Sequence, residues 1–330
     1  MIQARAGHTS TLLTDGTVFI TGGFNTVTLN STELLNITTG LWMTGSSMSI
    51  KRFYHTATVL FDGDVLVVGG SEGSIIYSSS AEIYEPSTRT WRNTTSMSSG
   101  GRASHTATLL PDGRVIIIGG LDGSSAKSSV EIFNYSSEIW TVGPSMAQAR
   151  YDHTATLLKT GFVLVTGGLD GINELQYCEL YDPVSNTWMS TGNLTVGREK
   201  HTASLLSNGT VLVSGGNNGI TGRLDSSESY DPSTGLWTTK GNLGNARYLH
   251  TATVLNTGEV LVSGGVDNSN VELASAEIYD PVNEIWSTGG GLTMNRARSQ
   301  HRASMLEDGR VIVTGGGMVS SFANQSEIFS

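Results

Sequence analysis

The chain has 330 residues, of which 38% are hydrophobic and 15% are charged, and this composition is typical of a folded protein rather than a disordered one. Its 19 lysines and arginines against 29 acidic residues give a net charge of −10 without any basic cluster, which excludes nucleic acid and anionic membranes as favoured partners. No apolar run approaches the roughly 20 residues of a membrane-spanning helix, so membrane insertion is not expected. The single cysteine, Cys178, excludes an internal disulfide framework.

One repeat organises the whole sequence. Its histidines recur every 47 to 51 residues and its tryptophans every 48 or 49, and no histidine or tryptophan falls outside this register. The tryptophans are Trp42, Trp91, Trp140, Trp188, Trp237 and Trp286. We therefore expect one domain over residues 1–330, with repeats at about 5–51, 52–101, 102–149, 150–197, 198–246, 247–297 and 298–330.

Each repeat begins with two predicted strands joined by a tight turn. The first strand mixes small and apolar residues, as in HTATLL at residues 105–110. A turn such as Asp112-Gly113 follows, in which glycine supplies the positive φ that a short hairpin requires. The second strand, VIIIGG at residues 115–120, is apolar without alternation, which is typical of a strand that is covered on both faces.

Two further strands complete the repeat. After a variable Ser/Asn/Gly-rich segment comes a third strand such as AEIYDP at residues 276–281, whose Asp-Pro forms a turn, and a fourth strand carries the tryptophan. One small four-stranded sheet cannot bury both of its faces alone. Repeats must therefore pack face to face, and closing them into a ring removes the exposed ends. The sequence predicts an all-β, seven-bladed β-propeller.

The repeat also resembles the kelch repeat. The resemblance rests on the Gly-Gly doublet, the Glu-x-Tyr-Asp of the third strand, the tryptophan nine residues after that glutamate, and the Met or Leu and Arg before the next unit. It covers essentially the whole chain and is closest to kelch units of bacterial and galactose-oxidase-like propellers. The resemblance implies a last blade completed by a strand from the other terminus.

The seventh repeat stops short of its tryptophan. It ends at SEIFS, residues 326–330, after the third strand. We therefore expect a three-stranded seventh blade in this chain, with the closing strand lying upstream in a larger parent protein. The alternative is that a three-stranded blade is native.

Three residue types recur in every repeat. A functional site usually occurs once in a protein, whereas a feature of every repeat usually serves the architecture. We therefore expect each arginine to pair with a glutamate. We expect each histidine to form a hydrogen bond with a backbone group near the strand entrance. The Arg-x-x-His pairs are Arg5/His8, Arg52/His55, Arg102/His105, Arg150/His153, Arg198/His201, Arg247/His250 and Arg298/His301. The third-strand glutamates are Glu33, Glu82, Glu131, Glu179, Glu228, Glu277 and Glu327.

Metal binding by these histidines is the alternative. Nitrogen ligands of zinc or copper lie about 2.0–2.1 Å from the ion, whereas packed sheets are about 10 Å apart, so equivalent residues of adjacent blades should not converge. The resemblance to galactose oxidase would imply a copper site of a cysteine-linked tyrosine, a second tyrosine and two histidines. Cys178 stands where sister repeats have Ala, Ser, Thr or Val, and every histidine belongs to the repeat. We expect no metal and no cofactor, and the oxidase activity is not carried over.

The residues that vary between repeats are the candidates for ligand contact. The two positions inside each Arg-x-x-His enter the innermost strand beside the channel mouth, and in kelch-like propellers the loops between second and third strands lie on the same face. Aromatic faces together with carboxylates and amides suit a sugar ring or a peptide. The candidates are Phe53, Tyr54, Tyr77, Tyr151, Asp152, Glu199, Lys200, Arg223, Tyr248 and Gln300.

These features predict a monomeric, non-catalytic binding module for a protein or a glycan. Two alternatives stay open. Carboxylates such as Asp152 and Glu199 could serve as the acid and base of a sugar-modifying or hydrolytic enzyme, or the ring could be a spacer without a ligand. Seven Asn-x-Ser/Thr sequences, where chance gives roughly five, lend little support to secretion. An extracellular location is slightly favoured only if the parent protein is secreted.

Overall fold

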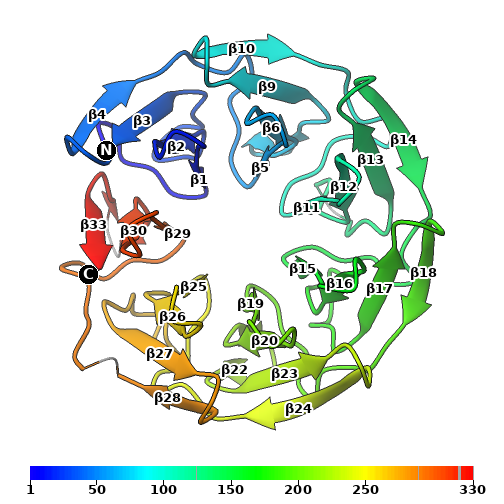
Figure 1. Cartoon of the computed structure of the whole chain (residues 1–330), viewed down its shortest axis with the longest axis vertical. Coiled ribbons are helices and arrows are strands. Elements are labelled where there is room, and N and C mark those ends of the chain that lie inside the picture. Colours follow the sequence, from blue (N-terminus) through cyan, green and yellow to red (C-terminus); the bar gives the residue numbers. More distant parts are fainter. Residues whose placement is uncertain (124, 289, 319–320, 330) are drawn as a thin grey trace.

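Seven small antiparallel sheets surround one axis in the computed structural model, which describes residues 1–123, 125–288, 290–318 and 321–329 (Figure 1). Six sheets have four strands in sequence order from the axis outward, and the seventh has three, β29-β30-β33. The predicted seven-bladed propeller is confirmed. No helix in the described part of the chain is long and apolar enough to cross a membrane.

The strands fall into four concentric sets. The blades are numbered 1 to 7 in the chain order of their innermost strands. The innermost strands are β1 (Thr9–Leu12), β5 (Thr56–Val59), β11 (Thr106–Leu109), β15 (Thr154–Leu157), β19 (Thr202–Leu205), β25 (Thr251–Val254) and β29 (Arg302–Met305). The second strands are β2 (Val18–Thr21), β6 (Val65–Val68), β12 (Arg114–Ile118), β16 (Val163–Thr166), β20 (Val211–Ser214), β26 (Val260–Ser263) and β30 (Val311–Thr314).

The outer half of each blade holds the third and fourth strands. The third strands are β3 (Thr32–Asn36), β9 (Ala81–Glu85), β13 (Val130–Asn134), β17 (Cys178–Asp182), β23 (Ser227–Asp231), β27 (Ala276–Asp280) and β33 (Ser326–Phe329). The fourth strands are β4 (Leu41–Thr44), β10 (Thr90–Asn93), β14 (Ile139–Gly143), β18 (Thr187–Ser190), β24 (Leu236–Lys240) and β28 (Ile285–Ser287). Short hairpins in the loops between second and third strands are β7 (Ser71–Gly73) with β8 (Ile76–Tyr77), β21 (Asn217–Asn218) with β22 (Gly222–Arg223), and β31 (Gly317–Met318) with β32 (Ser321–Phe322).

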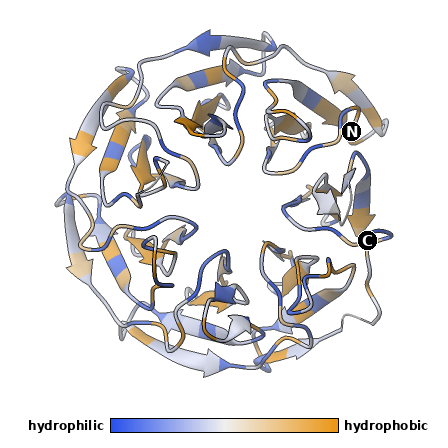
Figure 2. Cartoon of the chain, turned by 180° about the vertical axis from the view of Figure 1, so that it is seen from behind, coloured by the Kyte–Doolittle hydropathy of each residue, from blue (hydrophilic) through white to orange (hydrophobic). Residues whose placement is uncertain are grey.

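The core lies between the blades, and the second strands contribute to it on both faces. Val65 and Val67 of β6 pack with Phe19 of blade 1, whereas Leu66 packs with Ile117 of blade 3. Successive side chains of one strand therefore enter two different cores, which explains why these strands are apolar without alternation. In Figure 2 the hydrophobic colour gathers in the inner strands of the blades, and the hydrophilic colour is frequent in the loops around the channel.

The tryptophans of the fourth strands join neighbouring blades. The ring of Trp91 lies 5.2 Å from that of Tyr84 in its own blade, and its Nε1 donates to the carbonyl oxygen of Ser46 in the preceding blade at 2.8 Å. Trp140, Trp188 and Trp237 donate to preceding-blade carbonyls in the same way. Each of these residues thus links two sheets at the rim.

Blades 7 and 1 meet where the two ends of the chain lie close together (Figure 1). The hydroxyl oxygens of Ser10 and Ser304 are 3.3 Å apart, and Gly316 donates its N–H to the carbonyl of Arg5 at 2.9 Å. The ring is therefore closed by contacts of the innermost strands and of the adjoining loops, although blade 7 has no fourth strand among the described residues.

Candidate functional site

The arginine of each Arg-x-x-His unit is fully buried and ties its own blade together. Nη1 of Arg198 donates to the carbonyls of Gly215 at 2.8 Å and Ser226 at 3.0 Å, and Nη2 lies 2.9 Å from Oε1 of Glu228. Glu228 also accepts the N–H of Thr195 at 2.8 Å. Burial lowers the pKa of Arg198, and the Glu228 carboxylate opposes that shift. These contacts hold the strands of the blade together.

The same pairing occurs in the other blades, with one variation. The direct pairs are Arg5–Glu33, Arg52–Glu82, Arg150–Glu179, Arg198–Glu228, Arg247–Glu277 and Arg298–Glu327. In blade 3, Arg102 and Glu131 are 4.0 Å apart. The hydroxyl of Ser99 lies between them, 2.6 Å from each.

Each histidine contacts a side chain of the preceding blade, a partner that the sequence did not predict; His55, His105 and His201 also have the predicted backbone partner, in the arginine three residues earlier. The contact pairs a histidine Nε2 with a threonine Oγ1, 2.9–3.1 Å apart at six junctions. The reason is that the first residue of each innermost strand faces the next blade, where the imidazole lies. The pairs are Thr9–His55, Thr56–His105, Thr106–His153, Thr154–His201, Thr202–His250 and Thr251–His301.

The Gly-Gly doublets allow this close approach. A Cβ on Gly22 would lie 2.5 Å from the carbonyl oxygen of Arg52 and 2.6 Å from Cε1 of His55. Gly23 donates its N–H to that same Arg52 carbonyl at 2.8 Å. Any side chain at the first glycine would push the two blades apart, so the doublet is an architectural feature and not a phosphate-binding loop.

The second variable residue of each Arg-x-x-His unit forms a backbone ring around the channel mouth, which we call the collar. All seven residues have positive φ, between 49° and 59°. At six junctions each N–H donates to the carbonyl of the equivalent residue one blade earlier, at 2.9–3.4 Å. The collar consists of Gly7, Tyr54, Ser104, Asp152, Lys200, Leu249 and Gln300.

The collar corrects the expectation that equivalent residues of adjacent blades stay about 10 Å apart. That spacing applies to the middle of packed sheets, whereas the blades of a ring converge toward its axis. The convergence brings backbone groups together rather than metal ligands. Among the described residues, no group of three or more His, Cys, Asp or Glu side chains could hold a metal ion.

A pocket of about 240 Å³ opens at the collar, and we call it the mouth pocket. The backbone bridges Phe53–Ser71 and Tyr151–Leu169 place the Arg-x-x-His loops beside the loops between second and third strands, so both contribute to one face. Six of the ten ligand candidates line the pocket, and all six are half-buried. They are Phe53, Tyr54, Tyr77, Tyr151, Asp152 and Lys200.

The other four candidates lie outside the mouth pocket. Glu199 is buried, and its Oε1 accepts from the amide of Asn217 at 3.2 Å. The guanidinium of Arg223 covers the ring of Tyr248, 4.7 Å from its centroid, and so occupies that aromatic face. The hydroxyl of Tyr54 donates a hydrogen bond to Oε1 of Gln300, with 2.7 Å between the two oxygens.

Lys200 is the electrostatic centre of the mouth. Its Nζ lies 3.5 Å from Oδ2 of Asp152 and 3.4 Å from Oε2 of Glu199. Burial opposes the charge on Lys200, but the two carboxylates together raise its pKa. Burial also raises the pKa of Glu199. Because an ammonium lies between Asp152 and Glu199, these two carboxylates form a fixed charge network rather than a free acid and base pair.

Two aromatic residues beside the mouth pocket, Phe24 and Phe322, were not predicted as candidates from the sequence. The ring of Phe24 lies 5.0 Å from that of Phe53 and 5.4 Å from that of Phe322, and it also contacts Tyr54 edge-on. Phe24 directly follows a Gly-Gly doublet, the position that pairs with the Arg-x-x-His loop of its own blade. That register was the signal that could have identified it.

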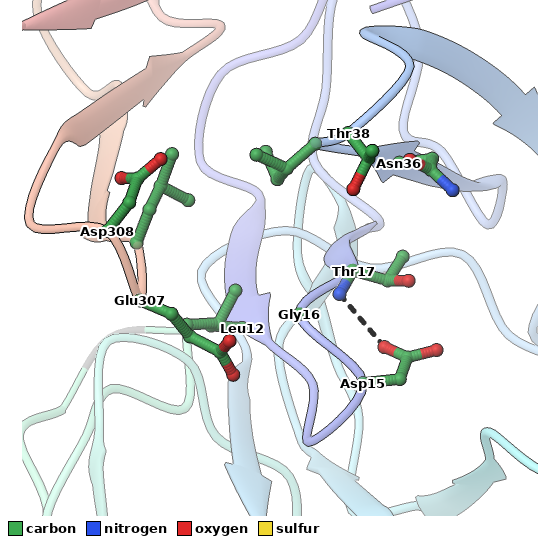
Figure 3. Close-up of a pocket in the computed structure, with 10 residues that line it drawn as sticks. Leu12, Asp15, Gly16, Thr17, Asn36, Thr38, Glu307 and Asp308 are labelled. Carbon is green, nitrogen blue, oxygen red and sulfur yellow. Dashed lines mark hydrogen bonds between the residues drawn. The ribbon is translucent and has the colours of Figure 1, made fainter.

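A second hollow of about 250 Å³ lies at the opposite ends of the innermost strands, between blades 7 and 1 (Figure 3). Two of its carboxylates form contacts within their own turns. Oδ1 of Asp15 accepts the N–H of Thr17 at 2.9 Å, and Asp308 pairs with Arg310 at 2.6 Å. With no aromatic side chain lining it, this hollow offers less to a ligand than the mouth pocket does.

The blades and their repeated contacts define a kelch-repeat β-propeller, and the Kelch motif matches residues 5–49 and 246–293. The Attractin/LZTR1 beta-propeller family matches residues 36–222, more than half of the chain. The chain belongs to that family. No curated protein matches it in sequence. Among solved structures, it is similar to a fungal alcohol oxidase of the AA5 family in complex with copper, with a TM-score of 0.78 and 16% identity over 96% of this chain and 70% of that one.

This structural likeness extends to the fold alone, because the residues present here do not fit a copper centre. Each of six histidines has its Nε2 beside a threonine hydroxyl inside a blade junction. Cys178 is buried in the core with Leu164 and Val211, and burial raises the pKa of its thiol to about 11. These donors are separated from one another and are packed inside the blades or their junctions.

Proposed function

We propose that this propeller is a non-catalytic binding module that takes its ligand, a glycan or the side chains of a protein partner, in the mouth pocket. The observation that carries the proposal is the convergence of Phe53, Tyr77 and Tyr151 with the Lys200–Asp152 pair in one pocket of about 240 Å³. Stacking on the aromatic rings supplies apolar contact area, and the charged pair fixes the orientation of polar groups.

The chemistry of the mouth suits ligands that both donate and accept hydrogen bonds. The ammonium of Lys200 donates, whereas the carboxylate of Asp152 accepts, and the two groups hold each other in place. Sugar hydroxyls and peptide groups match such a mixed surface. A pre-ordered pair also costs a ligand less conformational entropy than mobile side chains would.

The absence of catalysis is part of the proposal. An acid and base pair needs one carboxyl group that releases a proton and one that accepts it, with room for a water or a substrate between them. Here the space between Asp152 and Glu199 is occupied by the Lys200 ammonium. The network supports recognition of a polar ligand better than it supports glycoside hydrolysis.

The test is binding of the purified chain to a glycan array and to a peptide library. The variant Tyr77→Ala/Tyr151→Ala removes two rings from the mouth pocket. The matched control is Phe61→Ala, which removes an aromatic ring that is 71% exposed in the hairpin turn of blade 2 on the opposite face. We expect the double variant to lose at least about tenfold in affinity, or about 1.4 kcal/mol, while the control binds like the wild type.

Equal binding by the wild type and the double variant would refute the mouth as the site. Selective binding of a sugar in the wild type alone would assign a glycan ligand, and selective binding of a peptide would assign a protein partner. No binding by any folded sample would favour a spacer role.

A further inference from the structure

Arg302 breaks the repeat at the innermost strand of blade 7. In the other six blades the residue after the histidine is threonine, and its hydroxyl contacts the histidine of the next blade. Arg302 occupies that position in β29, so its side chain leaves the strand toward blade 1 and the channel. A long cation thus replaces a small hydroxyl at one junction of seven.

The histidine across this junction does not depend on Arg302. His8 of blade 1 lies 3.3 Å from the hydroxyl of Thr314, which belongs to the second strand of blade 7. A hydroxyl partner is therefore supplied from one strand further out. Because His8 already has a partner, architecture alone does not account for the arginine.

The guanidinium of Arg302 also has no counter-charge within the described part of the chain. The other buried arginines each face a glutamate, whereas no described carboxylate lies within 4.0 Å of Arg302. Among the described residues it makes one hydrogen bond, from Nη1 to the carbonyl of His301 at 3.5 Å. Most of its five donors therefore lack a protein acceptor.

The surroundings of Arg302 are uncharged and close to the collar. Its positive charge acts on His8, His55 and His301, whose pKa values are lowered chiefly by burial and further by this charge. The same charge opposes the rise that burial causes in the pKa of the collar residue Tyr54. Burial lowers the pKa of Arg302 itself. Arg302 is nevertheless only half-buried, because the innermost strands border the accessible channel.

We propose that the channel binds a small monoanion, a carboxylate or a halide, on the guanidinium of Arg302. A positive charge that lacks a protein counter-charge and lies beside neutral imidazoles attracts a small anion into the channel. The planar donor fork suits a carboxylate in particular, because both of its oxygens can accept in parallel. Arg302 does not line the mouth pocket, so this anion site is independent of the ligand proposed there.

The test compares thermal unfolding of three proteins in increasing sodium acetate and sodium bromide. Arg302→Thr restores the residue of the six sister repeats. Arg296→Thr is the matched control, because Arg296 is an exposed arginine shortly before the seventh repeat and the control reports the general effect of salt. We expect the wild type and the control to gain about 2 °C or more over Arg302→Thr as either anion saturates the site.

Crystals of the wild type soaked in bromide provide a second measurement that needs no variant. An anomalous peak in contact with the Arg302 guanidinium supports the proposal, and its displacement by acetate would show that a carboxylate shares the site. Identical salt responses of the wild type and Arg302→Thr, or no bromide beside Arg302, would overturn it. Neither result depends on whether a glycan or a peptide binds at the mouth pocket.

Discussion

Nε2 of His55 lies 3.1 Å from the hydroxyl oxygen of Thr9, across the boundary between blades 1 and 2. Equivalent contacts at five further junctions place one buried imidazole at each. A protonated ring there would carry a charge into a packed boundary. The contact therefore makes closure of the ring sensitive to protonation.

Stability should fall as the solution becomes acidic. Burial lowers the pKa of His105, His201 and His301 to about 3, while an unfolded histidine titrates near 6.5. The unfolded chain therefore binds more protons between about pH 6.5 and 3, so stability is complete above this window and is lost as the pH falls through it. Each histidine costs up to about 1.4 kcal/mol per pH unit. Urea unfolding midpoints at pH 7, 6 and 5 measure this loss.

A histidine variant gives the control for the acid prediction. His105→Gln should lower the free energy of unfolding at pH 7. It should also make that free energy depend less steeply on pH, because the variant takes up as much as one proton fewer on unfolding. A wild type equally stable at pH 7 and pH 5 would contradict the role assigned to the imidazoles.

The glycine doublets should tolerate no side chain. In Gly69→Ala the new Cβ would lie 2.6 Å from the carbonyl oxygen of Arg102 and 2.7 Å from Cε1 of His105. Neither neighbour can move without opening the junction, so we expect a loss of roughly 3 kcal/mol or more in the free energy of unfolding. Gly16→Ala is the control, since Gly16 has a φ of +77° but no atom within 4 Å of the added carbon, and about 1 kcal/mol is expected there. Equal losses would show that backbone strain alone sets the cost.

The stability of blade 3 should depend on the hydroxyl of Ser99. Ser99→Ala removes the group that lies 2.6 Å from both Arg102 and Glu131, and it leaves the two charges 4.0 Å apart. We expect a loss of about 1–3 kcal/mol by chemical denaturation, the usual cost of an unsatisfied buried polar group. Ser49→Ala, whose hydroxyl makes an exposed contact with Asn93, should change stability little. An unaffected Ser99→Ala variant would mean that Arg102 and Glu131 close onto each other directly.

The tryptophans should differ in their contribution. Nε1 of Trp188 donates to the carbonyl of Pro144 at 2.8 Å, whereas Nε1 of Trp42 makes no hydrogen bond within the described residues. Trp188→Phe should therefore cost about 1 kcal/mol more than Trp42→Phe, because both substitutions remove similar volume but one also removes a bond between blades. Urea unfolding of the two variants, followed by circular dichroism, compares them. A larger loss for Trp42→Phe would contradict this assignment.

The fold could be predicted from the sequence because the same pattern of strands and turns recurs seven times. One uninterrupted apolar run such as residues 115–118 is ambiguous, but seven runs at a fixed spacing, each preceded by an Asp-Gly, Asn-Gly or Thr-Gly turn, permit few architectures. The pairing of Arg198 with Glu228 also follows from repetition, since two opposite charges in every repeat need each other once they are buried.

The details near the axis could not be predicted in this way. The threonine partner of His55 and the bonds of the collar arise because the blades converge, and convergence is a property of the closed ring rather than of one repeat. Lys200 between Asp152 and Glu199 depends on contacts across blades 4 and 5. The departure of Arg302 from the threonine of its register can be read in the sequence, but the missing counter-charge is visible only in three dimensions.

The collar has a consequence for how such a protein can change. Its bonds use only backbone atoms, and its side chains already range from none at Gly7 to an aromatic ring at Tyr54 and an ammonium at Lys200. Exchange of one collar side chain therefore leaves the hydrogen bonds that close the mouth intact. The propeller offers seven positions around one opening, so that a new specificity can be acquired one blade at a time on an unchanged backbone scaffold.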